Sequence, residues 1–152
     1  MADEVHRVRR PCEVLPLARC LALGCDRPSM VAAGLAELIS NGIEHGNLEI
    51  GFARKRAWLA RGQFERERQL RLDAPSTRVR DVCVSVDRFA DVVRFRIRDQ
   101  GSGFDWPSWL DFDESRADAP NGRGIALARA SCFASLYYIG RGNVVEALAL
   151  RA

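Results

Sequence analysis

The sequence predicts an α+β protein, a two-layer α/β sandwich in which a mixed, largely antiparallel sheet carries helices on one face. Three observations lead to this fold class. Two stretches with apolar residues at helical spacing come first, and two short runs with period-two alternation follow them as a hairpin. After a loop rich in Gly, Pro and Asp, a short helix precedes a second hairpin. Helices that precede strands grouped in hairpins are typical of this class.

Two helices are predicted in the first third of the chain. Pro11–Cys25 has apolar residues at helical spacing, and Pro11 can open the helix because the first helical N–H needs no partner. The second helix has Asp26 as its expected N-cap and Pro28 at an early helical position, and it continues to about His45. The Gly46-Asn47 pair is expected to end it.

The strands are predicted from alternating apolar and polar residues. The expected strands are Val5–Arg9, Val82–Val86, Val92–Ile97, Leu136–Ile139 and Asn143–Leu150, the first of them a short edge strand. A charged helical stretch over Phe52–Leu72, interrupted at Gly62, should lie between the early helices and the first hairpin. Gly101–Gly124 is expected to be a long loop, and Ile125–Cys132 a short helix.

Composition and charge limit the classes of function. A chain of 152 residues with 47% hydrophobic and 28% charged residues suits one soluble domain, here residues 1–152. With neither a signal peptide nor an apolar run long enough to span a bilayer, we expect a cytoplasmic protein without membrane contact. The five cysteines show no CxxC spacing and only two histidines are present, which argues against a zinc site. Basic residues dominate between Arg54 and Arg80, but we expect a solvated or partner-facing helix there rather than direct nucleic-acid binding.

The second helix combines an apolar face with a polar stripe. At about 3.6 residues per turn, Glu37, Asn41, Glu44 and His45 share one side of the helix. Glu37 and Asn41, four residues apart, direct a carboxylate and an amide oxygen at one place. An amide oxygen suits Mg²⁺, and a carboxylate can orient or deprotonate a nucleophile, so the pair indicates phosphoryl transfer. The alternative is an ordinary solvated helix face.

Two glycine-rich segments complete the candidate site. Asp99 follows a predicted strand and can accept a hydrogen bond from the exocyclic amine of adenine, while Gly101 and Gly103 let the backbone approach a ligand closely. Gly122, Arg123 and Gly124 precede a helix start, where free N–H groups attract phosphate. Each segment alone is equally consistent with a turn or a loop.

Together, "GLAELISNGIEHGN", "RIRDQGSGFDW" and "NGRGIALAR" resemble the GHKL ATPase superfamily, whose nucleotide site is the Bergerat fold, and within it the branch of anti-sigma-factor serine kinases. The resemblance covers the motif-bearing core, residues 27–150. It implies ATP and Mg²⁺ as cofactors, with Glu37 as candidate general base and Asn41 as the magnesium ligand. It also implies that Asp99, Gly101 and Gly103 bind adenine.

The same resemblance assigns phosphate contacts to Gly122 and Gly124 and an ATP lid to Phe104–Pro120, while Arg123 adds charge or supports the lid. Gly42 departs from the family pattern, which usually has Ala at this position. The charged stretch between Asn47 and Asp81 is longer than in the simplest anti-sigma kinases. It resembles the form attached to response-regulator and phosphatase modules.

The expected function is that of an ATP/Mg²⁺-dependent protein serine/threonine kinase in a partner-switching pathway. The resemblance implies an anti-sigma-factor antagonist of the STAS-like kind as substrate, a sigma factor as alternate partner, and leaves a homodimer open. The alternatives are a nucleotide-gated binding module without kinase activity, or an ATPase domain excised from a larger response-regulator or phosphatase protein. The chain offers no helical segment with a phospho-accepting His, which argues against the catalytic domain of a sensor histidine kinase.

Overall fold

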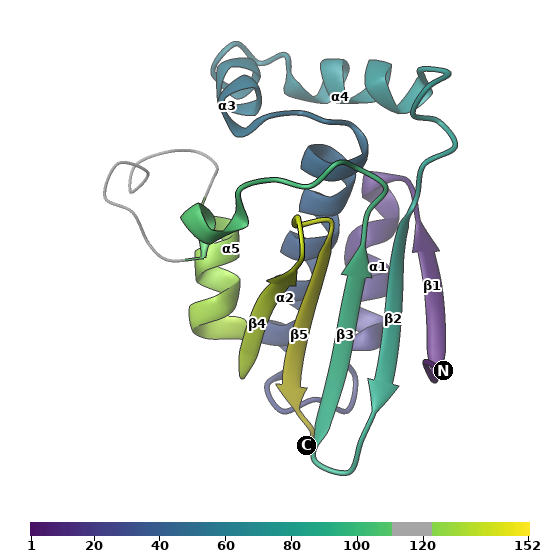
Figure 1. Ribbon diagram of the computed structural model, residues 1–152, viewed down its shortest axis with the longest axis vertical. Coiled ribbons are helices and arrows are strands. Elements are labelled where there is room, and N and C mark those ends of the chain that lie inside the picture. The colour runs from purple at the N-terminus through teal and green to yellow at the C-terminus, as the bar shows by residue number, and fades with distance from the viewer. Residues whose placement is uncertain (111–122) are drawn as a thin grey trace.

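A five-stranded antiparallel sheet with helices packed on one face forms the α+β architecture (Figure 1). The computed structural model describes residues 1–110 and 123–152. The strands are β1 (Glu4–Val8), β2 (Val82–Arg88), β3 (Val92–Arg98), β4 (Ser135–Ile139) and β5 (Val144–Leu150). Their order across the sheet is β1-β2-β3-β5-β4. Every pairing between these strands is antiparallel, so the expectation of a mixed sheet is wrong for the described residues.

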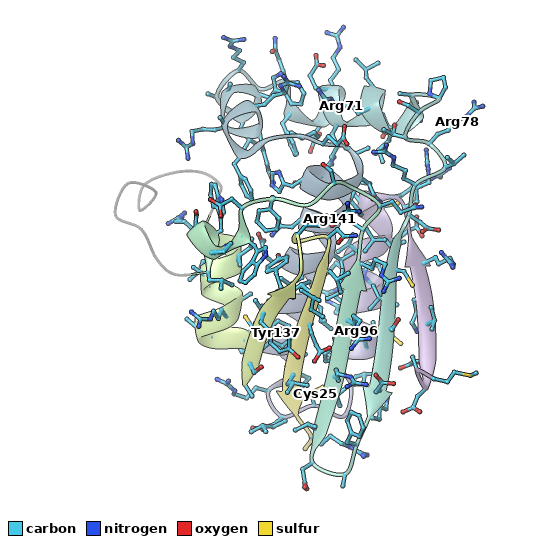
Figure 2. All side chains as sticks on the ribbon, viewed as in Figure 1. Cys25, Arg71, Arg78, Arg96, Tyr137 and Arg141 are labelled. Atoms are coloured by element: carbon cyan, nitrogen blue, oxygen red, sulfur yellow. The ribbon has the colours of Figure 1, made fainter. Side chains whose placement is uncertain are left out.

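Period-two alternation explains the two sides of the sheet. In β2, Val82, Val84 and Val86 are buried, and their neighbours Cys83 and Ser85 are less so. The same alternation in β3 and β5 builds one apolar face, on which α1 (Pro11–Leu21) and α2 (Pro28–Asn41) lie. The opposite face carries polar side chains, and Figure 2 shows Arg96 and Tyr137 on it. The predicted strands are therefore confirmed, including the edge position of β1.

Both early helices are confirmed, with corrected ends. α1 stops at Leu21 rather than near Cys25, because Gly24 turns the chain with φ +83° and Cys25 forms a bridge to Arg151. The N-cap of α2 is Arg27, with φ +52°, and not Asp26. The backbone N–H of Asp26 instead donates to the carbonyl of Leu150 at 2.8 Å, so Asp26 is hydrogen-bonded to the last residue of β5.

The second helix continues beyond Asn41 as η1 (Gly42–Asn47), a π-helical segment. Beyond it lie α3 (Phe52–Ala60) and α4 (Phe64–Asp73), separated at Gly62 with φ +67°, which confirms the expected interruption. Figure 1 shows this helical pair across the end of the sheet where β3 ends. The pair therefore stands outside the two-layer sandwich but close to Asp99, the residue after β3.

The remaining segments surround the same end of the sheet. A short 3-10 turn, η2 (Trp106–Trp109), follows β3, and α5 (Gly124–Leu127) continues as the π-helical η4 (Ala128–Cys132). The expected short helix over Ile125–Cys132 is thus confirmed. Most of the expected ATP lid, from residue 111 to Pro120, lies outside the described residues. No helix in the described ranges has the length and apolar character needed to cross a membrane.

Candidate functional site

The two predicted polar residues of α2 lie where this helix meets α5. Leu35, Leu38 and Ile39 are buried on the sheet side of α2, and Glu37 and Asn41 are half-buried. The carboxyl group of Glu37 fills the space beside Gly124 so closely that a Cβ on residue 124 would overlap it. The fold thus brings the first and third motifs into contact.

The second motif packs against the end of the same helix through glycines. A Cβ at position 46 would overlap the carboxyl group of Asp99, and a Cβ at position 101 would overlap the carbonyl of Gly46. The N–H of Gly101 donates to Oδ1 of Asp99 at 2.8 Å. Gly103 has φ +92° and touches the backbone of Arg141. Glycine is therefore required here both for close approach and for a left-handed backbone.

Asn47 holds these two segments together and was not predicted as a site residue. This residue is only 2% exposed, and its side-chain Oδ1 accepts the N–H of Gln100 at 2.6 Å. Arg80 donates to its backbone carbonyl at 2.8 Å. In the sequence, Asn47 was interpreted only as part of a helix end. The position of a polar Asn among buried apolar residues was the one available signal.

Asn41, Gly46, Asp99 and Gly103 border a pocket of about 430 Å³, a volume that includes the open space at its mouth. It lies between η1, the end of β3 and the β4–β5 turn. Its lining consists of Leu38, Asn41, Gly42, His45, Gly46, Phe52, Ile97, Asp99, Gly103, Phe104, Ile125, Tyr138, Gly142, Asn143 and Val145. A mostly apolar cleft with a few convergent polar groups is the usual form of a small-ligand site.

Burial changes the acidity of both carboxyl groups. Burial raises the pKa of Asp99 to about 6, although the hydrogen bond from Gly101 opposes this. Burial also raises the pKa of Glu37 above its ordinary value, and the charge of Glu44 adds to this effect, while Lys55 and Asn41 oppose it. Asp99 lines the pocket, and Glu37 lies one helical turn from the lining residue Asn41. Carboxyl groups with raised pKa values in or near a cleft are typical of functional sites.

Glu44, which the sequence placed on the same polar stripe, points away from the pocket. This residue is 4% exposed, and its carboxylate binds Nζ of Lys55 at 2.6 Å and Nη1 of Arg68 at 3.0 Å. These cations come from α3 and α4. The charge of Glu44 therefore ties the helical pair to η1, and we exclude it from the ligand-binding set.

Asn41 fits a role in holding a magnesium ion. Its side chain lines the pocket, and its buried Nδ2 makes no hydrogen bond of normal geometry among the described residues, although the amide lies near enough to Glu37 to oppose the rise in the pKa of that carboxyl group. The amide oxygen and nitrogen exchange places on rotation of the amide, so the same position can present Oδ1 to a cation. No group of three or more His, Cys, Asp or Glu that could hold a metal ion occurs in the described ranges. Mg²⁺ bound with a nucleotide needs few protein ligands, because phosphates and waters supply the others.

The remaining predicted residues contribute less. Arg123 is exposed directly before α5 and does not line the pocket. Gly122 lies outside the described residues, so its predicted phosphate contact stays a prediction. Of the predicted set, Asn41, Asp99 and Gly103 line the pocket. Glu37 and Gly124 pack against each other, and Gly101 contacts Asp99, but these three residues are not part of the lining.

The chain was compared with protein families and with curated proteins. No protein-family model matches the chain, and no curated protein matches it either. The function of the protein is therefore inferred from the residues that meet in the pocket and from the resemblance of the three motifs.

Proposed function

We propose that this protein binds ATP with Mg²⁺ and acts as a protein serine/threonine kinase of the GHKL superfamily, with a Bergerat-type site. The observation that carries the proposal is the convergence of three motifs far apart in the sequence. Residues from α2, from the segment after β3 and from the start of α5 meet around one pocket. Random polar residues on a solvated helix and in two unrelated turns would not meet in this way.

Asp99 is the proposed reader of the adenine base. Among the described residues, the hydrogen bond that its side chain accepts comes from Gly101, which leaves Oδ2 to accept one from an exocyclic amine. The glycines at 46 and 101 let this carboxyl group sit deep in the pocket without side chains in front of it. A buried acceptor of this kind selects against bases that present a carbonyl at the same place.

Glu37 and Asn41 are the proposed phosphate-end residues. Asn41 would hold the magnesium ion, which supplies positive charge to the phosphate oxygens. Glu37, one helical turn away, would orient the incoming hydroxyl group and accept its proton. Its raised pKa makes it a stronger base than an exposed carboxylate.

The substrate and partners are proposed from the motif resemblance alone. They are a STAS-like anti-sigma-factor antagonist, phosphorylated on Ser or Thr, and a sigma factor bound in alternation. A nucleotide-gated binding module would use the same pocket without transfer. The two functions differ in what Glu37 does, and so one experiment separates them.

Nucleotide binding is tested by calorimetric titration of ATP with and without Mg²⁺. We expect Asp99→Asn to weaken ATP binding about tenfold or more. The substitution replaces Oδ2, the proposed acceptor, by an NH₂ group, and this group would face the exocyclic amine of adenine, which is also a donor. Asn41→Asp should change the dependence on Mg²⁺. Asp87→Asn is the matched control, since Asp87 binds Arg94 on the outer sheet face at 2.8 Å. Unchanged affinity in both pocket variants would refute the proposed site.

Kinase activity is tested with labelled ATP and STAS-like antagonist domains. We expect Glu37→Gln to retain ATP affinity and to lose at least about a hundredfold in transfer rate. Undiminished transfer by this variant would refute Glu37 as the base. If the wild type binds ATP but transfers phosphate to none of these domains, the protein is a nucleotide-gated binding module and not a kinase.

A further inference from the structure

Phe52, the first residue of α3, joins the α3–α4 pair to the pocket. α3 has no buried residue, so a few half-buried side chains attach it. Of the described residues that line the pocket, Phe52 alone belongs to α3 or α4. One turn further on, Lys55 binds the buried carboxylate of Glu44 at 2.6 Å. This ion pair keeps the start of α3 against η1 and Phe52 at the pocket wall.

Two rings fix the orientation of Phe52. The ring of His45 stacks on it with a centroid distance of 3.9 Å and an interplanar angle of 22°. The indole of Trp109 stacks on it at 3.9 Å and 16°. Two rings cannot share one face at these distances, so they cover opposite faces of Phe52. Phe52 can therefore meet the contents of the pocket only with its ring edge.

A ring edge is a suitable contact for a planar base. The edge of an aromatic ring is electropositive and the face of a neighbouring ring is electronegative, which favours edge-to-face packing. The same pocket already contains this geometry, because Phe104 and Tyr138 meet at 5.0 Å and 85°. Phe104 lies 6.4 Å from Phe52, so both rings border the same space.

We propose that Phe52 contacts the adenine base of the nucleotide through its ring edge and holds the base against Asp99. The inference depends on the ATP site proposed above and extends it to a residue outside the three motifs. It makes the α3–α4 pair part of the nucleotide site. The His45 and Trp109 rings keep the Phe52 edge in place before the base arrives.

The test compares ligands with and without a base. We measure Mg²⁺-dependent binding of ATP and of inorganic triphosphate to the full chain, for the wild type and for Phe52→Ala. ATP affinity should fall about tenfold, in the range of base–aromatic contacts, while triphosphate affinity should stay within about twofold. Phe89→Ala is the matched control, because Phe89 is 47% exposed in the β2–β3 turn and does not line the pocket.

Phe52→Leu is a second variant that separates loss of the ring contact from a folding defect. It keeps an apolar anchor on α3 but lacks the ring edge, and so it should also lose ATP affinity with the triphosphate affinity unchanged. Unchanged ATP affinity in a folded variant would overturn the contact. An equal loss for ATP and triphosphate would overturn it too, because Phe52 would then act only through the general integrity of α3. A wild type that binds no ATP would instead overturn the proposed function itself.

Discussion

The buried charge of Asp99 should lower the stability of the ligand-free protein, and Asp99→Asn should restore that stability. Burial raises the pKa of this carboxyl group from its ordinary value of 3.8 to about 6. The folded protein therefore keeps a proton that the unfolded chain loses between about pH 4 and pH 6. Since the folded state binds more protons in this window, the free energy of unfolding falls as the pH rises through it.

The magnitude follows from the difference between the two pKa values. Each pKa unit is worth about 1.4 kcal/mol, so the ionised Asp99 lowers the free energy of unfolding by up to about 3 kcal/mol above pH 6. Asparagine has the same shape, keeps an acceptor for the N–H of Gly101, and carries no charge. Asp99→Asn should therefore be more stable than the wild type by about this amount at pH 8 and equally stable near pH 4.

Urea denaturation followed by tryptophan fluorescence, at several pH values and constant ionic strength, measures this difference. The effect of Glu37, whose pKa is also raised by burial, is present in both proteins and cancels in the comparison. Asp87→Asn serves again as the control, because it removes a carboxylate from the outer sheet face. Equal or lower stability of Asp99→Asn at pH 8 would refute the claim that the pocket makes this charge costly.

Three further predictions concern the same end of the sheet. ATP affinity should fall about tenfold between pH 7 and pH 5, because Asp99 takes up its proton near pH 6 and the oxygen that carries it becomes a donor toward the amine of the base, while the other oxygen accepts from Gly101; Asp99→Asn should show a flatter profile in the same titration. Gly124→Ala should lower both the melting temperature and the affinity for ATP, because the added Cβ overlaps the carboxyl group of Glu37; equal melting curves would contradict that packing. Lys55→Met should lower the free energy of unfolding by about 1–3 kcal/mol, because among the described residues it leaves Arg68 as the one cation bound to the buried Glu44; the exposed Arg56→Met should change it by less than about 0.5 kcal/mol.

Periodicity predicted the layers of the fold because each layer buries one regular face. Alternation in β2 and β3 and the helical spacing in α2 follow from packing against the same core, and the structure confirms them. The start of α2 was wrong because Asp26 has a competing partner, the carbonyl of Leu150, more than a hundred residues away in the sequence. Rules for helix ends use only neighbouring residues in the sequence, so they cannot predict this contact.

A candidate site could be predicted where short motifs carry their own chemistry. Glu37, Asn41 and Asp99 are polar residues in otherwise apolar or glycine-rich surroundings, and this contrast is visible in the sequence. Phe52 and Asn47 were missed because their roles depend on tertiary contacts. An aromatic residue at the start of a charged helix has no distinguishing pattern until His45 and Trp109 are seen on its two faces.

The turn between α3 and α4 offers a place for protein engineering. Gly62 has open space where a Cβ would stand, and its neighbours Arg61 and Gln63 are exposed. A fluorescent domain inserted at this turn would leave the core and the sheet intact. Because α3 begins with Phe52 at the pocket wall, a displacement of α3 on binding of the proposed nucleotide would be measurable through the inserted fluorophore, without a label in the pocket itself.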